Sequence, residues 1–344
     1  MGESVHRMLG ISDAQLFSMY QTMRLARTVD ERLWLLNRAA KISFVVSCQG
    51  HEAVQVGSVA ALTPREDWFC PYYRDLGMML ALGQTPLDAM LAAFARRDDP
   101  NSGGRQMLAH YSDRKRRVLS GSSPTATQVL HAVGIAYAMR LRKERGVVLA
   151  SCGEGATSQG EFHEACNFAG VYHLPVIFLV QNNRYAISVP LTRQVAGGSI
   201  AKRAAGYGFY GVHLDGTDIF QVYRTVQEAV QRARDGRGPT LLEAWVPRLR
   251  PHSSDDDDRV YRTEVEQMQD HQQDPLPRLR QYLFQFRLAS ESELNRCDQQ
   301  AVEQVDEAIR QAEAAPFPNP STLGRYVRAG VHREGPDDGS SFLY

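Results

Sequence analysis

The stretch that decides the fold reads VVLASCGEGATSQGEFHEACNFAGVYHLPVIFLVQNNRY and covers residues 147–185. It opens with an apolar run at residues 147–152 and ends with a second one at 175–180, separated by a glycine turn and a segment of helical composition. Short apolar runs with β-branched residues are typical of buried strands. The order strand, turn, helix, strand predicts a β-α-β unit. Ser158 and Glu161 have capping-box spacing, so we expect the helix to begin there with its positive dipole end facing the turn.

Polar side chains follow both predicted strands. Glu154 lies between Gly153 and Gly155 after the first strand, and Asn182 and Asn183 follow the second. Because parallel strands end at one edge of a sheet, a carboxylate and amide oxygens are expected to converge there. Such oxygen ligands suit magnesium or calcium, and magnesium needs only one or two carboxylates when phosphates supply further oxygens. A Walker loop is excluded because no Lys-Ser or Lys-Thr pair follows the glycines.

The composition is that of a globular protein with balanced charge. The 344 residues are 43% hydrophobic and include 39 basic and 39 acidic side chains, which argues against nucleic acid and anionic membranes as partners. Five cysteines without a Cys-x-x-Cys pair argue against a disulfide framework and a structural zinc site, and they favour a cytoplasmic location. No apolar run approaches about 18 residues, and residues 1–10 lack the core of a signal peptide, so we expect a soluble, unprocessed chain.

Elements on either side of this unit predict a doubly wound α/β fold with helical ends. A helix over residues 219–234 is followed by a strand over 240–246, which extends the alternation of helices and strands. Helical patterns are expected at 13–40, 274–285 and 290–314. The predicted parts are an N-terminal helical extension at 1–40, an α/β domain at 41–262, and a C-terminal helical extension and tail at 263–344, of which the tail is ordered only by a partner.

Three further stretches allow two interpretations each. Residues 67–74 hold an aromatic cluster that ends in Arg74, and form either a cofactor wall with a phosphate clamp or a buried strand with a snorkelling arginine. Residues 121–128 are a hydroxyl-rich turn that binds a monovalent cation or, as is commoner, caps a helix. The acidic stretch 248–262 is a mobile, solvated loop, or it presents His252 for proton transfer, since an ordinary histidine pKa of ~6.5 suits neutral pH.

Taken together, these motifs resemble a known family. The Gly-Glu-Gly turn and the Asn pair, separated by 26 residues, resemble the thiamine diphosphate signature with Glu154 in place of the usual Asp. From about residue 13 to residue 320, the chain resembles the alpha subunit of the thiamine-dependent decarboxylase component of 2-oxo acid dehydrogenase complexes, closest to the branched-chain (2-oxoisovalerate) type. The motifs that align in order are Gly50-His51-Glu52-Ala53, Tyr73-Arg74, Gly104-Arg105-Gln106-Met107, Ser122–Gln128, Gly153–Asn183 with Tyr185–Ser188, and His252-Ser253 with Tyr261-Arg262.

The resemblance implies a thiamine-diphosphate-binding fold of three αβα layers with a mostly parallel sheet. It implies that Glu154, Asn183 and the carbonyl of Tyr185 hold magnesium, and that His252 faces the reaction centre as the catalytic residue. The other residues that it assigns to the cofactor site are Tyr73, Arg74, Ser123, Thr125, Gly153, Gly155 and Ala156. A potassium site of relatives matches Ser122, Pro124, Thr127 and Gln128. Ser253 matches the regulatory phosphorylation position of mitochondrial relatives.

The implied activity is oxidative decarboxylation of branched-chain 2-oxo acids, with reductive acylation of the lipoyl group of an acyltransferase component. No second α/β domain follows residue 247, so the resemblance implies that a beta subunit supplies a catalytic glutamate within an α2β2 heterotetramer. The alternatives are the alpha subunit of pyruvate or acetoin dehydrogenase, and a catalytically silent cofactor-binding homologue.

Four positions depart from the family pattern. Gln181 stands where relatives carry Arg or Glu, which suggests that a charged contact to the diphosphate is lost or supplied elsewhere. Thr125 replaces an apolar residue and Tyr72 replaces an amide, so the size of the substrate pocket is left open. Arg184 follows the Asn pair where some relatives have Gly.

Overall fold

The computed structural model describes residues 4–325 and is built around a five-stranded sheet in which every pairing is parallel. The strands lie in the order β1-β2-β3-β7-β6. Their bounds are β1 Trp68–Cys70, β2 Val148–Gly153, β3 Val176–Asn182, β6 Tyr210–Asp215 and β7 Thr240–Trp245, and a separate antiparallel hairpin joins β4 Tyr185–Ala186 to β5 Val189–Pro190. The predicted β-α-β unit is therefore confirmed as β2 and β3, which pair directly at the middle of the sheet.

Eleven α-helices surround the sheet within the described part of the chain. They are α1 Val5–Met8, α2 Asp13–Arg38, α3 Glu52–Ala60, α4 Leu76–Ala81, α5 Pro86–Ala93, α6 Thr127–Leu141, α7 Gly160–Val171, α8 Ile219–Arg234, α9 Glu264–Gln272, α10 Pro275–Gln285 and α11 Glu291–Ala314. Short 3-10 helices lie at Arg114–Arg116, Glu154–Ser158, Leu191–Arg193, Ala201–Tyr207, Asp258–Val260 and Pro320–Thr322.

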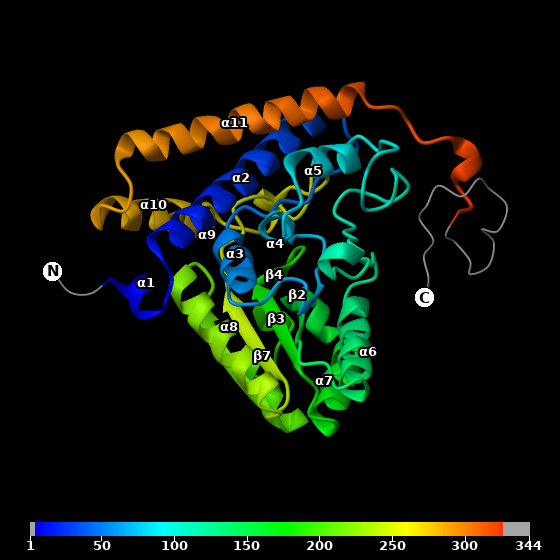
Figure 1. Cartoon of the computed structure of the whole chain (residues 1–344), viewed down its shortest axis with the longest axis vertical. Coiled ribbons are helices and arrows are strands. Elements are labelled where there is room, and N and C mark those ends of the chain that lie inside the picture. Colours follow the sequence, from blue (N-terminus) through cyan, green and yellow to red (C-terminus); the bar gives the residue numbers. More distant parts are fainter. Residues whose placement is uncertain (1–3, 326–344) are drawn as a thin grey trace.

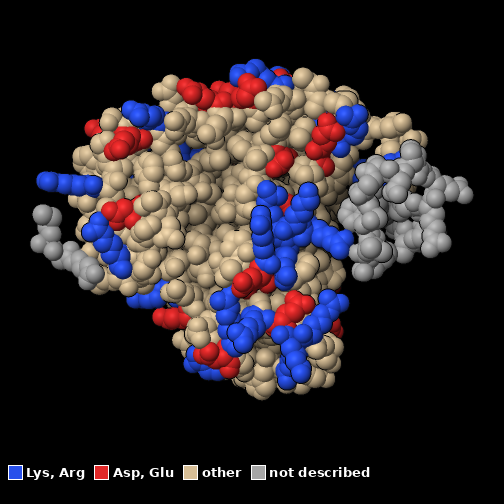
Figure 2. Space-filling view, viewed as in Figure 1, with Lys and Arg blue, Asp and Glu red and all other residues tan. Residues whose placement is uncertain are grey.

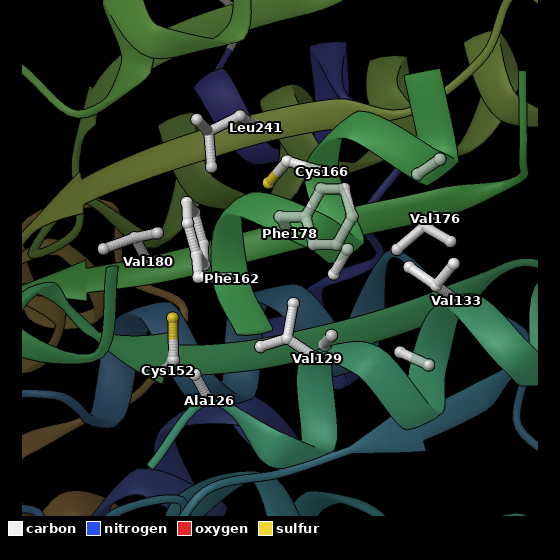
Figure 3. Packing of buried hydrophobic residues seen from close by; sticks show 14 of the residues in the cluster. Ala126, Val129, Val133, Cys152, Phe162, Cys166, Val176, Phe178, Val180 and Leu241 are labelled. Atoms are coloured by element: carbon white, nitrogen blue, oxygen red, sulfur yellow. The ribbon is translucent and has the colours of Figure 1, made fainter. Parts of the chain in front are cut away.

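Helices cover both faces of the sheet and produce three layers. On one face, α6 and α7 pack on β2 and β3, where Val129 and Phe162 meet Phe178 and Val180 (Figure 3). On the other face, α3, α4 and α8 bury a second core against the same strands. Every residue of β3 is buried, because a central parallel strand has no solvent-facing side. The predicted three-layer α/β architecture is confirmed.

The helical ends of the chain pack on each other. Figure 1 shows α11 lying along α2 and α5 above the α/β layers, and apolar side chains of these helices form a core of their own. Ser12 caps α2 by accepting from the Gln15 N–H, and Ser290 caps α11 by accepting from the Glu293 N–H. The part of the predicted tail at residues 326–344 lies outside the described residues, and the division at residues 40 and 262 stays a prediction.

One expectation about local structure is wrong, and one of the two interpretations of the acidic stretch is not supported. Ser158 does not cap the helix after β2, because the chain first makes a 3-10 turn over Glu154–Ser158, and α7 begins at Gly160. The hydroxyl of Thr157 stabilises that turn by donating to the Glu154 carbonyl at 2.7 Å. The acidic loop is not free of the fold, since Asp258 is buried beside Arg262 at 3.2 Å, and α9 follows it directly.

Acidic and basic side chains are interspersed over the face shown in Figure 2, in line with the balanced composition. Basic side chains gather in the middle and lower part of the face shown in Figure 2. Arg117 lies over the Trp68 ring at the start of β1, with 5.6 Å between guanidinium carbon and ring centroid.

A buried ionic cluster joins three helices. Arg27 of α2 donates to Glu52 of α3 at 2.6 Å and to both oxygens of Asp274, the N-cap of α10, at 2.8 and 2.9 Å. Burial of a carboxylate is costly unless a cation compensates it. The cluster therefore fixes how the N-terminal and C-terminal helices meet the α/β layers.

We expect Arg27→Met to lower the free energy of unfolding by about 3–5 kcal/mol, because Glu52 would stay buried without its cation. Urea unfolding of the purified chain measures this change. The matched control is Arg32→Met, which removes a partly exposed pair with Asp306 and should cost less than about 1 kcal/mol. Equal costs for the two substitutions would contradict the assignment of the cluster as a structural joint.

Candidate active site

A cavity of about 390 Å³ opens where β2 and β3 end. It brings together all eleven residues that were assigned to the catalytic and cofactor site, and these are Tyr73, Arg74, Ser123, Thr125, Gly153, Glu154, Gly155, Ala156, Asn183, Tyr185 and His252. They come from the loops after β1, β2, β3 and β7 and from the segment before α6. Parallel strands cause this convergence, because their carboxyl ends meet at one edge of the sheet. The volume lies in the ordinary range for a small-molecule site.

Glu154 provides an oxygen without a partner. The residue is 1% exposed, and its Oε2 accepts the Asn183 N–H at 3.3 Å. Its Oε1 has no hydrogen-bond partner among the described residues, and burial raises the pKa of the carboxyl. A bound cation would compensate this buried carboxylate. Within residues 4–325, no group of three or more His, Cys, Asp or Glu side chains gathers in a metal-binding arrangement, so a metal here would depend on amide, carbonyl and phosphate oxygens, as magnesium does.

The hairpin after β3 packs directly on the glycine turn. A Cβ atom added to Gly155 would lie 2.6 Å from the Cβ of Ala186, so only glycine allows this approach. The amide oxygen of Asn183 accepts the Tyr185 N–H at 3.2 Å, which turns the chain back over the cavity. The carboxylate of Glu154 and the loop of Asn183 and Tyr185 are thereby held against each other.

Arg74 is a buried cation with no carboxylate partner. It is 1% exposed and donates to the Ser47 carbonyl at 2.5 Å, and its second terminal nitrogen lies 3.4 Å from His252 Nδ1. No ion pair forms between it and any described acidic residue, and its Nε has no partner. A guanidinium left in this state on a cavity wall is suited to an anionic group such as a phosphate.

His252 is held in place by the acidic loop. Its backbone N–H donates to Asp256 at 2.7 Å, and the Tyr261 hydroxyl donates to the same oxygen. The Tyr73 ring meets the imidazole edge to face, with 6.0 Å between centroids. Burial, Arg74 and Arg248 lower the pKa of His252 to about 3, from the ordinary value of ~6.5. The imidazole is therefore neutral at neutral pH.

Only two of the four residues matched to a potassium site line the cavity. Ser122 and Gln128 line the cavity, whereas Pro124 and Thr127 do not. The Ser122 hydroxyl donates to the Pro124 carbonyl at 3.2 Å, and the Gln128 amide donates to the Ser151 carbonyl at 2.9 Å. This turn thus contributes a hydroxyl and an amide to the cavity.

Gln181 does not line the cavity but lies fully buried beneath it. Its amide nitrogen donates to Asp75 at 2.6 Å, and its oxygen lies 2.8 Å from His51 Nδ1 and 3.2 Å from Gln55 Nε2. Gln181 therefore makes no contact at the cavity surface, and the expectation that a charged contact to the diphosphate is lost here or supplied elsewhere stays a prediction. Its side chain supports the cavity from below instead of facing a ligand.

Some residues of the site are missed by sequence reasoning. Asp256 was included in a solvated acidic run, although its position four residues after His252 is a usable signal for a local hydrogen bond. Asp75 had no signal, because its partners Ser151 and Gln181 are far away in the sequence. Ser253, which matches a phosphorylation position, is only 7% exposed, so a kinase would have to open this turn first.

Comparison with known proteins shows the family to which this chain belongs. The Dehydrogenase E1 component family matches residues 20–321. The chain is 49% identical over 329 residues to the 2-oxoisovalerate dehydrogenase subunit alpha of Bacillus subtilis (strain 168), which covers 96% of this chain and 100% of that relative. It is 38% identical to the mitochondrial 2-oxoisovalerate dehydrogenase subunit alpha of Homo sapiens, over 90% of this chain and 69% of the relative. It is 41% identical to the 3-methyl-2-oxobutanoate dehydrogenase subunit alpha of Mycobacterium tuberculosis, over 77% of this chain and 69% of the relative. The chain belongs to the dehydrogenase E1 component family.

Proposed function

We propose that this chain is the alpha subunit of a branched-chain 2-oxo acid dehydrogenase. It catalyses thiamine-diphosphate-dependent oxidative decarboxylation of 3-methyl-2-oxobutanoate and related acids, and transfers the acyl group to a lipoyl arm. The observation that carries the proposal is the pairing, in one cavity, of a buried carboxylate oxygen without a partner on Glu154 and a buried guanidinium without a counterion on Arg74. Names shared by relatives that are 38% to 49% identical support the branched-chain substrate class.

The donor set is suited to magnesium and a diphosphate. Glu154 Oε1, the amide of Asn183 and the carbonyl of Tyr185 would hold the metal, and Arg74 would face the phosphate oxygens. When bound, thiamine diphosphate supplies the carbon nucleophile and the electron sink for decarboxylation. The residues of this chain orient the reacting groups and transfer protons. His252 holds or moves a proton at the reacting centre, and the Tyr73 ring holds the imidazole in place by an edge-to-face contact. We also propose that potassium stabilises the turn of Ser122, Pro124, Thr127 and Gln128.

Only one carboxylate lies among the described residues that line the cofactor cavity. Among its lining residues in the described chain, Glu154 is the only acidic one, and it is committed to the metal in this proposal. A second carboxylate, needed at the other end of the cofactor, would therefore come from another chain. We propose the beta subunit of an α2β2 heterotetramer for this role, with the lipoyl acyltransferase component as the further partner.

We propose the cytoplasm as the location. All five cysteines are free and buried, which suits a reducing compartment. In the part of the chain that the structure describes, no helix has the length and apolar character needed to cross a membrane.

The substrate and the partner can be tested together. We expect decarboxylation of 2-oxoisovalerate only when this chain is combined with its beta partner, magnesium and thiamine diphosphate, and a lower rate with pyruvate. A difference of one methylene in an apolar pocket is worth only about 1–3 kcal/mol, so the ratio of kcat/KM values is the quantity to measure. A higher kcat/KM for pyruvate would show that the substrate is not a branched-chain 2-oxo acid. Activity of this chain alone would refute the proposal that two chains form the active site.

Glu154→Gln should weaken magnesium-dependent binding of thiamine diphosphate by roughly tenfold or more, because a neutral amide replaces the buried anionic ligand. Isothermal titration calorimetry measures the change in affinity, once with magnesium present and once with magnesium removed by a chelator. Glu164→Gln on the exposed side of α7 is the matched control and should bind as the unchanged chain does. Equal affinities of the two variants for thiamine diphosphate would show that Glu154 does not bind the metal.

His252→Ala should slow reductive acylation of a lipoyl domain by roughly 10²-fold or more, the usual contribution of a positioned acid or base. Single-turnover assays of the assembled enzyme give the rate. His213→Ala on strand β6 is the control, since that histidine is exposed and lies outside the cavity lining. An unchanged rate of acylation in His252→Ala would refute the proposed role of His252 in proton transfer.

A further inference from the structure

The segment that carries His252 separates two cavities. His252 lines the cofactor cavity, whereas its neighbours Pro251 and Ser254 line a second cavity of about 510 Å³. The turn is fixed to the body of the protein, because the Ser254 N–H donates to the Val45 carbonyl at 2.9 Å and the Ser254 hydroxyl accepts the Val45 N–H at 3.1 Å. A ligand in the second cavity would therefore contact the backbone that positions His252.

The second cavity has an excess of positive charge. Five arginines but only three aspartates line it, and these residues are Arg38, Arg248, Arg250, Arg259, Arg262, Asp256, Asp257 and Asp258. The three aspartates are already engaged: Asp257 by Arg259 at 2.7 Å, Asp258 by Arg262 at 3.2 Å, and Asp256 by the backbone N–H of His252 at 2.7 Å. No carboxylate is left over for the other cations.

Three of these guanidiniums form no ion pair with a described acidic residue, and of these Arg248 donates to the Ile187 carbonyl and the Tyr261 hydroxyl. Within residues 4–325, neither Arg38 nor Arg250 forms an ion pair, and Arg250 only donates its Nε to Gln49 at 3.2 Å. Arg38, which is exposed, ends helix α2, and Arg250 follows β7, so segments far apart in the sequence both contribute to the lining of this cavity. Arginines that line one cavity without carboxylate partners are suited to an anion with several oxygens.

An independent observation points to a ligand at this wall. Trp34 also lines the cavity, is 8% exposed, and its indole N–H has no hydrogen-bond partner among the described residues. A buried indole N–H normally finds a partner. The lining of this cavity therefore includes a neutral donor as well as the arginines.

We propose that this second cavity binds a small organic dianion, held by Arg38 and Arg250 with Trp34 as a further donor, and that its occupancy stabilises the turn of His252. The shared chemistry is a group of several anionic oxygens, which a phosphomonoester or a dicarboxylate can present. The cavity has the size of an ordinary metabolite site. Binding at this cavity does not depend on the proposed reaction, whereas any effect on turnover does.

The test uses the full chain assembled with its beta partner and saturated with magnesium and thiamine diphosphate, so that the cofactor cavity is filled. Inorganic phosphate and succinate are titrated at constant ionic strength, and binding is followed by calorimetry and tryptophan fluorescence. We expect saturable binding of at least one probe, with a fluorescence change that Trp34→Phe removes. Tighter binding of phosphate would indicate a phosphomonoester as the natural ligand, and tighter binding of succinate a dicarboxylate.

Arg38→Gln combined with Arg250→Gln should weaken binding roughly tenfold or more. Arg38→Lys combined with Arg250→Lys keeps the charge and reports whether the fold tolerates change at these positions. The matched control Arg224→Gln removes an exposed arginine on α8 and should leave the affinity unchanged. Absence of saturable binding of both probes, or equal affinity in the double glutamine variant and Arg224→Gln, would overturn the proposal.

Discussion

The active-site edge of this protein depends on one buried hydrogen bond, from the side-chain amide of Gln181 to the carboxylate of Asp75 at 2.6 Å. Asp75 also accepts the Tyr72 N–H at 3.0 Å and the hydroxyl of Ser151. The pair thus ties the end of β3 to β2 and to the segment after β1. Burial raises the pKa of Asp75 to about 6, so the carboxylate depends on these donors to stay charged at neutral pH.

The cofactor wall rests on this pair. Gln55 donates from one amide nitrogen to Gln181 at 3.2 Å and to the Arg74 carbonyl at 2.9 Å, which fixes the backbone that carries the guanidinium. Arg74 in turn lies against His252. Because each group is buried, loss of one partner would leave others without a hydrogen bond, and such networks act as a unit. The position of the cation at the cavity is therefore set by residues that never touch a ligand.

The turn of His252 is organised from both sides. On the cofactor side, Arg74 and Tyr73 contact the imidazole, and on the other side Asp256 and Ser254 hold the backbone. Burial first and the nearby guanidiniums of Arg74 and Arg248 second lower the pKa of His252, so an anion bound beside these arginines would reduce the repulsion and raise that pKa. The same electrostatics thus connects ligand binding with the proton chemistry of the site.

The sequence by itself determined the layered α/β fold, the helices at both ends and the convergence of Glu154 and Asn183 at one sheet edge, whereas the other cavity residues were assigned through the resemblance of the motifs to a family. Strand periodicity and glycine spacing are local properties, and the oxygen-bearing residues directly follow the strands, so the edge at which they meet could be predicted. Only the tertiary structure decided the start of α7, the role of Gln181 and the state of His252. A 3-10 turn competes with a cap over a few residues, the partners of Gln181 are up to 130 residues away, and a pKa depends on burial and on charges brought close by folding.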